Sequence, residues 1–192
     1  MKKYHYFLGA LILGVVLMSF ISTPTSTTSS DGGIHWMTIE EAMAASAKEP
    51  RKIMIDVYTK WCGPCKMMSQ NTFTDSSVVD YMNKNYYCVK FDAESADSVV
   101  FQGKTYKNPG YDPTKTGRNA VHEFSRYLQV SAYPTLIFMD EKGGYIGPVV
   151  GYKTPADLEL FVKFFAANMH LTVQTQEQWN AYVQGFKATW KK

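Results

Sequence analysis

The amino-acid sequence predicts an α/β fold in which helices flank a mixed central sheet. Short apolar runs with β-branched residues alternate with stretches that open on helix-capping residues. The connections between the first strands are long enough to hold a helix, so these strands should run parallel. Two later strands are joined by a glycine-containing turn, which predicts an antiparallel hairpin. A length of 192 residues fits one domain with appendages.

The first 33 residues are predicted to precede the folded domain. Lys2 and Lys3 come before a mostly apolar run from Phe7 to Ile21. This run has the length of a signal-peptide core and is short for a spanning helix, which needs about 20 residues. We interpret residues 1–22 as a signal peptide or N-terminal anchor, with a buried helix as a further alternative. Residues 23–33, rich in Ser and Thr, are predicted to be a flexible linker. Because residues 1–22 have the features of an export signal, we expect the protein to be exported.

The first half of the predicted domain, which spans residues 34–170, contains two strands and three helices. A capping box opens the first helix, and an aspartate caps the third. Both strands are apolar, which predicts that they are buried. In chain order, the elements are a helix from the Thr38–Glu41 box to about Lys48, a strand Lys52–Tyr58, a helix opened by a cysteine pair, a helix from Asp75 to about Asn83 and a strand Tyr86–Phe91.

The second half of the domain should hold a short helix, a hairpin and a final helix. The turn Asp140–Gly144 contains two glycines and joins the hairpin strands. Thr154 can cap the final helix, because Pro155 is favoured in a first helical turn. The elements are a helix His122–Gln129, strands Thr135–Met139 and Tyr145–Val150, and a helix from Thr154 to about Met169.

A polar segment at about residues 95–120 does not fit this plan. A loop this long in a compact domain is usually functional or disordered. It follows a parallel strand and should therefore lie at the sheet edge to which the cysteine pair is also delivered. It can contact substrate or simply cover the sheet. Its side chains would form a mildly basic rim of Lys104, Lys107, Lys115 and Arg118 with Tyr106 and Tyr111.

Residues 171–192 are predicted to add a C-terminal amphipathic helix, from Thr175 to Trp190. Apolar side chains recur on one face of this helix. We expect that face to pack on the protein's own domain, and docking of another chain is the alternative. The face consists of Trp179, Tyr182, Val183, Phe186 and Trp190.

Composition excludes some classes of function. Hydrophobic residues make up 45% of the chain and aromatic residues 15%, enough for a core without disulfide staples. Beyond residue 30 there are 18 basic and 17 acidic side chains, a net charge of +1. This balance gives no reason to expect nucleic acid as a partner. Three cysteines are an odd number, and two of them are close in sequence, which does not indicate a disulfide framework. The pattern indicates one reactive pair plus the isolated Cys88, which we interpret as an inert buried thiol.

The reactive pair is the run Trp61-Cys62-Gly63-Pro64-Cys65-Lys66, which follows a strand and opens a helix. A reactive thiol needs a lowered pKa, and the N-terminus of a helix stabilises the thiolate. Cys65 lies one turn later, close enough to form a disulfide with Cys62. The expected chemistry is attack by Cys62 on a substrate disulfide, followed by resolution by Cys65.

Two other interpretations of the pair are weaker. A structural disulfide across two residues closes a very small loop and stabilises little. A zinc site needs two further ligands at recognisable spacing, and the remaining candidates are scattered singly. These are Cys88, His35, His122 and His170.

The cysteine motif resembles the active-site motif of the thioredoxin family. Asp56, six residues before Cys62, matches that family's buried acid. Tyr133-Pro134-Thr135 matches its cis-proline loop, and Lys90 matches the lysine near the acid. The resemblance covers about residues 34–169 apart from the insertion. It implies a thioredoxin-like fold with a long insertion before the helix that precedes the cis-proline, and an extra C-terminal helix.

A second likeness concerns the region after the motif. Asn71–Asp75, with Val78 and Val79, is similar to the C-terminal domain of the bacterial membrane thiol:disulfide interchange protein. This likeness points to exported, reducing relatives, and it makes the periplasm the expected compartment.

The resemblance also implies roles for individual residues. It implies no metal and no cofactor other than a redox-active disulfide between Cys62 and Cys65. Catalytic roles fall to Cys62, Cys65 and Asp56, substrate binding to Trp61, Gly63, Pro64, Tyr133 and Pro134, and neighbouring positions to Lys66 and Lys90.

The sequence therefore predicts a thiol–disulfide oxidoreductase that reduces protein disulfides outside the cytosol and takes electrons from a membrane thiol carrier. The Gly63-Pro64 dipeptide resembles that of reducing members. A disulfide oxidase or isomerase is the close alternative. A non-catalytic binding module on the same fold is the alternative from another class, since fold alone does not establish activity.

Overall fold

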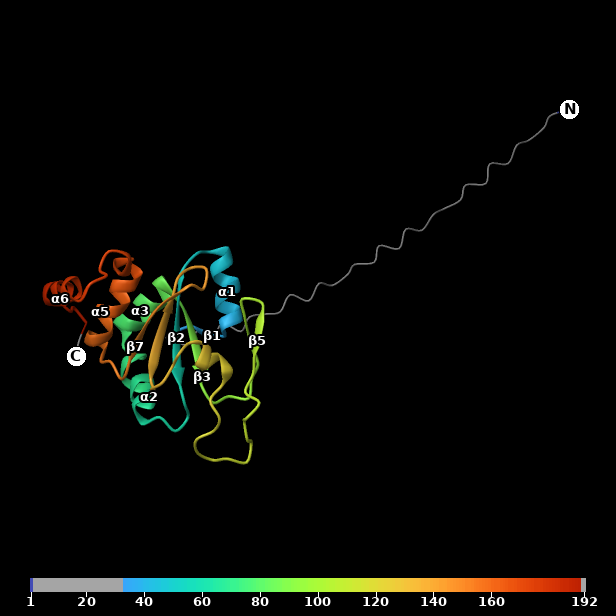
Figure 1. The fold of residues 1–192 in the computed structure, drawn as a ribbon. Coiled ribbons are helices and arrows are strands. Elements are labelled where there is room, and N and C mark those ends of the chain that lie inside the picture. Colours follow the sequence, from blue (N-terminus) through green and yellow to red (C-terminus); the bar gives the residue numbers. More distant parts are fainter. Residues whose placement is uncertain (2–32, 191–192) are drawn as a thin grey trace.

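A five-stranded mixed sheet forms the centre of the molecule (Figure 1). Its strands lie in the order β1-β3-β2-β6-β7. The first three run parallel, whereas β6 and β7 are each antiparallel to the preceding neighbour. The mixed sheet predicted from the sequence is thereby confirmed. The strands are β1 (Trp36–Met37), β2 (Lys52–Tyr58), β3 (Tyr86–Asp92), β6 (Thr135–Met139) and β7 (Tyr145–Val150).

This fold comes from a computed structural model that describes Met1 and residues 33–190. The predicted apolar segment Phe7–Ile21 and the linker up to residue 32 lie outside the described residues. Among the helices that are described, none is both long and apolar enough to cross a membrane.

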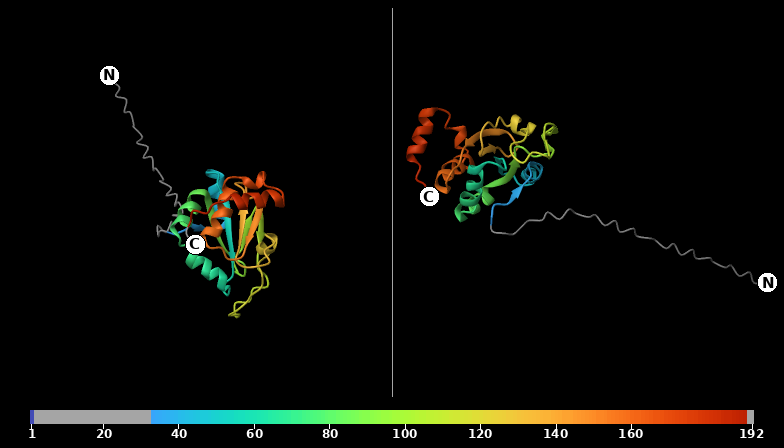
Figure 2. Two further views of the ribbon diagram at one scale, coloured as in Figure 1. Left: turned by 90° about the vertical axis from the view of Figure 1, so that its left-hand side faces the viewer. Right: turned by 90° about the horizontal axis from the view of Figure 1, so that it is seen from below.

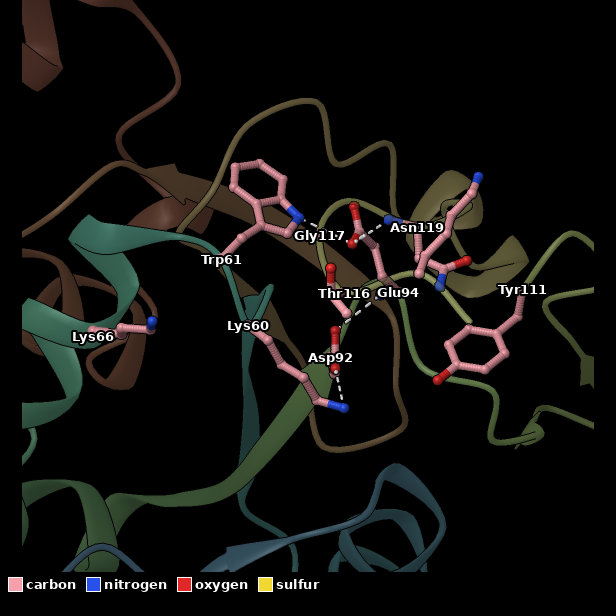
Figure 3. Close-up of a pocket in the computed structure, with 10 residues that line it drawn as sticks. Lys60, Trp61, Lys66, Asp92, Glu94, Tyr111, Thr116, Gly117 and Asn119 are labelled. Carbon is pink, nitrogen blue, oxygen red and sulfur yellow. Dashed lines mark hydrogen bonds and ion pairs between the residues drawn. The ribbon is translucent and has the colours of Figure 1, made fainter. Parts of the chain in front are cut away.

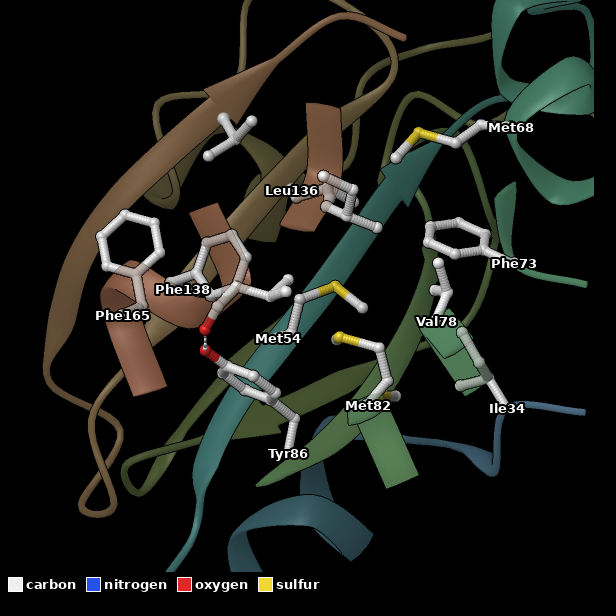
Figure 4. Close-up of a cluster of buried hydrophobic side chains, with 14 of the residues drawn as sticks. Ile34, Met54, Met68, Phe73, Val78, Met82, Tyr86, Leu136, Phe138 and Phe165 are labelled. Carbon is white, nitrogen blue, oxygen red and sulfur yellow. Dashed lines mark hydrogen bonds between the residues drawn. The ribbon is translucent and has the colours of Figure 1, made fainter. Parts of the chain in front are cut away.

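Helices cover both faces of the sheet (Figures 1 and 2). Because side chains alternate along a strand, Met54 of β2 faces a core built with α3 and α5, whereas Ile53 and Ile55 face a core built with α1 and α4. Figure 4 shows the first of these cores. The helices are α1 (Ile39–Lys48), α2 (Gly63–Met67), α3 (Ser76–Asn85), α4 (Glu123–Tyr127), α5 (Pro155–Ala166) and α6 (Gln176–Gly185), with a π-helical turn at Met68–Thr72 and a 3₁₀ turn at Met169–Leu171.

Local capping signals set most helix starts, as predicted. Thr38 and Glu41 form the expected reciprocal capping box of α1. Asp75 accepts hydrogen bonds at the start of α3, and Thr154 does the same for α5. Each cap satisfies backbone N–H groups that have no partner inside the helix, which fixes where the helix begins.

The insertion differs from the predicted irregular loop. It contains a two-stranded hairpin of β4 (Val99–Phe101) and β5 (Lys104–Tyr106). Val99, Phe101 and Tyr106 are buried in the core on the α1 side of the sheet. The prediction of a basic rim that includes Tyr106 is therefore wrong: Tyr106 anchors the hairpin to the domain, and the ammonium of Lys104 stacks over its ring at 4.7 Å.

Two helix ends were also predicted too far along the chain. α5 ends at Ala166, because Asn168 adopts a left-handed backbone conformation with φ 56°. α6 ends at Gly185, so Trp190 does not continue its apolar face. Trp190 instead follows an extended segment and packs edge-to-face on Tyr81, with ring centroids 5.5 Å apart.

The C-terminal helix packs against α5. Trp179 and Tyr182 of α6 contact the ring of Phe164, at centroid distances of 5.1 and 5.0 Å. Beyond the helix, the buried carboxylate of Glu159 accepts hydrogen bonds from the backbone N–H groups of Thr189 and Trp190. The tail is thus held on the side of the domain that carries α5 (Figure 1).

Candidate active site

Cys62 and Cys65 lie where the chain leaves the C-terminal end of β2. Cys62 is the N-cap of α2, and its sulfur accepts a hydrogen bond from the backbone N–H of Cys65 at 3.1 Å. The two side chains form a disulfide with an S–S distance of 2.06 Å. Pro64 stands in the first turn of α2, where its missing N–H costs no helical hydrogen bond.

The two cysteines line different hollows of the protein. Cys62 lines an open depression that we call the outer groove, together with Trp61, Pro64, Arg118, Asn119 and Tyr133. Cys65 does not line that groove. It lines a second open hollow, which we call the inner cavity because it reaches the buried Asp56, together with Thr59, Ser69 and Lys90. Asp56 therefore shares a hollow with Cys65 and not with Cys62.

Asp56 lies beneath the cysteine pair on the central strand. Its side chain is only 4% exposed, and its carboxylate lies 3.5 Å from the ammonium of Lys90. Burial raises the pKa of Asp56 to about 6, although the charge of Lys90 and a hydrogen bond from it act in the opposite direction. Lys90 also stacks over the rings of Trp36 and Tyr58, at 4.8 and 5.2 Å. Lys90 therefore lies next to Asp56, as the resemblance implied.

The proline loop lies beside the cysteine pair, as predicted. The peptide bond between Tyr133 and Pro134 is cis. The rings of Tyr133 and Trp61 pack edge-to-face, with centroids 5.9 Å apart. This contact joins the cysteine motif to the proline loop and forms part of the floor of the outer groove.

The remaining predicted positions surround the pair. Gly63, Pro64 and Lys66 are exposed, and Lys66 lines the inner cavity. Cys88 is buried in β3, and burial raises the pKa of its thiol far above the ordinary value, with a smaller effect from the charge of Asp56. A thiol in that environment is unreactive. Residues 33–190 contain no cluster of three or more His, Cys, Asp or Glu side chains with metal-site geometry.

Glu94 is a neighbour of the site that sequence reasoning missed. Its carboxylate accepts hydrogen bonds from the indole N–H of Trp61 at 2.9 Å and from the backbone N–H of Asn119 at 2.8 Å (Figure 3). Glu94 follows β3 by two residues, at the edge of the sheet where the cysteine motif also lies. That position was the available signal, because loops at this edge of a parallel sheet commonly carry function.

The fold and the disulfide-bonded pair define a class, and the comparisons agree with it. The chain belongs to the thioredoxin-like domain family, whose model matches residues 39–166. The fold is shared with a thioredoxin from Thermus thermophilus, with a TM-score of 0.53, 16% identity and coverage of 71% of this chain and 89% of that one. The predicted resemblance to the thioredoxin family and the predicted fold class are both confirmed. The chain is a thioredoxin-fold protein with a disulfide-bonded pair, Cys62 and Cys65.

Two curated relatives are more specific in name. The thiol:disulfide interchange protein DsbD of Pectobacterium atrosepticum is 24% identical over 164 residues, which are 82% of this chain and 25% of that protein. DsbD of Pseudoalteromonas atlantica is 30% identical over 105 residues, which are 54% of this chain and 14% of that protein. The alignment thus spans a quarter or less of the length of these relatives.

The buried carboxyl of Asp56 makes a stability prediction. Since folding raises its pKa from the ordinary 3.8 to about 6, the folded state binds this proton more tightly than the unfolded chain does. The ionised carboxylate therefore opposes folding increasingly as pH rises from about 4 to about 6, by roughly 2–3 kcal/mol in total. Asp56→Asn should be more stable than wild type above this window and similar to it below.

Denaturant melts of the oxidised proteins at acidic and at mildly alkaline pH measure this difference. Asp80→Asn is the matched control, because Asp80 is exposed on α3 and its replacement should leave the pH dependence of stability unchanged. The raised pKa of Asp56 would be contradicted if Asp56→Asn were no more stable than wild type, or if it were more stable by the same amount at both pH values.

Proposed function

We propose that the protein is a thiol–disulfide oxidoreductase that reduces disulfides of client proteins outside the cytosol. The observation that carries the proposal is that the two cysteines of the disulfide line different hollows. Cys62 lines the outer groove, and Cys65 lines the inner cavity together with Asp56. The name of the DsbD relatives adds support for disulfide exchange.

In the first step, the Cys62 thiolate of the reduced protein attacks one sulfur of a client disulfide. A bond forms between Cys62 and the client, and the second client sulfur leaves as a thiolate. The position of Cys62 as N-cap favours its thiolate, because the free N–H groups of the first helical turn stabilise negative charge. Trp61, Gly63, Pro64, Tyr133 and Pro134 are the proposed client-binding residues.

In the second step, Cys65 resolves the mixed disulfide. Its thiol must lose a proton, and Asp56 is the proposed acceptor because its pKa of about 6 suits proton exchange near neutral pH. The Cys65 thiolate attacks Cys62, the client sulfur leaves as a thiolate, and the disulfide between Cys62 and Cys65 forms. Two electrons have then passed to the client.

The cycle needs a dithiol that reduces the pair again, and we propose a membrane thiol carrier as this donor. No cofactor beyond the cysteine pair is required by the exchange itself. Reduction is the proposed direction because the Gly63-Pro64 dipeptide resembles that of reducing family members. The proposed compartment, the periplasm, is inferred from the sequence of residues 1–22 and from the likeness to the interchange protein.

Cysteine variants test the roles of the two sulfurs. In the reduced protein, Cys62 should be alkylated first at near-neutral pH, because its thiolate is favoured. Cys62→Ser should lower disulfide reduction by several orders of magnitude, whereas Cys65→Ser should accumulate mixed disulfides on Cys62. Cys88→Ala is the control and should behave as wild type, since Cys88 is buried. Equal alkylation rates at Cys62 and Cys65, measured by mass spectrometry, would contradict the assignment.

The rate of resolution tests Asp56. Asp56→Asn should slow the second step about tenfold or more near neutral pH and affect the attack by Cys62 less, because only Cys65 shares the inner cavity with Asp56. Stopped-flow reduction of a model disulfide, followed by quenching and separation of the mixed disulfide, resolves the two steps. An unchanged resolution rate would make Asp56 a structural residue.

A reporter fusion tests the compartment. Alkaline phosphatase needs disulfides and is active only where they form. A fusion after residue 33 should be active in bacteria, and a matched fusion that lacks residues 1–22 should be inactive. If both fusions were inactive and the fusion with residues 1–33 lay in the cytosolic fraction, the proposed export would be wrong.

A further inference from the structure

The insertion forms one wall of the outer groove. Arg118 and Asn119 come from the insertion, and Ala132 and Tyr133 of the proline loop line the same groove. Cys62 and Trp61 of the cysteine motif line it as well. A client that reaches Cys62 therefore contacts the insertion as well as the cysteine motif.

Two residues of the insertion, Arg118 and Asn119, are connected to Trp61 of the cysteine motif. Glu94 holds the indole of Trp61 and the backbone of Asn119 through one carboxylate oxygen (Figure 3). The guanidinium of Arg118 stacks on the ring of Trp61, with its carbon 4.3 Å from the ring centroid. Asn119 in turn closes the loop by two side-chain hydrogen bonds to the backbone of Asp112.

The charges beside Cys62 that solvent can reach are positive. Lys60, Lys66, Lys115 and Arg118 are exposed and line the groove or the hollow next to it. The two carboxylates that line the same hollows are nearly buried: Glu94 is 9% exposed, and the side chain of Asp92 is 10% exposed. Both accept hydrogen bonds from the protein. Arg118 forms no ion pair with any side chain in the part of the chain that the structure describes.

We propose that Arg118 is a specificity-determining residue that favours client disulfides flanked by an acidic side chain. The inference rests on the proposed function and adds the class of substrate. The occupant is an extended segment of a client protein, with its disulfide cysteine at Cys62 and a Glu or Asp side chain at Arg118. Stacking on Trp61 holds the guanidinium plane beside the groove, and its N–H groups can donate to a carboxylate.

Charge complementarity selects this occupant. A basic side chain beside the client cysteine would meet Arg118 and, further along, Lys115. A neutral peptide would gain the apolar contacts with Trp61 and Tyr133 but no ion pair. Because the site is open to solvent, a single charge pair here should change selectivity by about threefold to fivefold.

The test compares short peptides whose single cysteine is in a mixed disulfide with 2-mercaptoethanol and is flanked by Glu, Gln or Lys. The measured quantity is the ratio of kcat/KM between the Glu and Lys peptides, at low and at high salt. The variants are Arg118→Gln and Arg118→Glu. Lys104→Glu is the matched control, because Lys104 is an exposed cation of the same insertion that does not line the groove.

Wild type and Lys104→Glu should prefer the Glu peptide about threefold to fivefold at low salt, and less at high salt. Arg118→Gln should remove most of this preference, and Arg118→Glu should reverse it. A wild-type protein that reduces all three peptides equally, or a preference that survives Arg118→Glu, overturns the specificity role alone. A wild-type protein that reduces no peptide and no small disulfide overturns the proposed function, and this inference with it.

Discussion

The burial of β2 between β3 and β6 determines where the cysteine motif and Asp56 lie in the protein. Residues 52–57 of this strand are all buried, so its course through the domain is fixed by packing on both faces. The chain leaves the strand at Tyr58 and reaches Cys62 four residues later. The same strand places Asp56 on the same face of the sheet as Met54, in register with Lys90. A buried carboxyl is costly, and the paired ammonium reduces that cost without removing it.

Around this core arrangement, the insertion adds features that the cysteine motif alone does not provide. Its hairpin is anchored by buried aromatic side chains, and its distal loop returns to the motif through Glu94 and Asn119. The hairpin stabilises the domain through burial of apolar side chains. The distal loop brings Arg118 to the groove that Cys62 lines. A segment with an irregular, polar sequence thereby becomes an ordered wall of the site.

Sequence reasoning succeeded where the signal is local. The bounds of β2, β6 and β7 match their predicted ranges because apolar runs and turn residues mark them directly. The two-residue β1 and the three-residue β4 and β5 are too short for a period to show, so they were missed. In the site, a contiguous motif and fixed spacings indicated Cys62 and Asp56. The contacts of Glu94 and Arg118 with Trp61 join residues far apart in the sequence, so no local pattern specifies them.

We propose that the cysteine pair acts as a reducing dithiol, and a measurement of its reduction potential decides between reduction and oxidation. The protein would be equilibrated with dithiothreitol or glutathione buffers of known potential, and the fraction of reduced Cys62 measured after alkylation. We expect a reduction potential more negative than about −200 mV, in the range of thioredoxins at about −270 mV. A value near about −120 mV, as in strongly oxidising family members, would contradict it and assign the protein to disulfide formation.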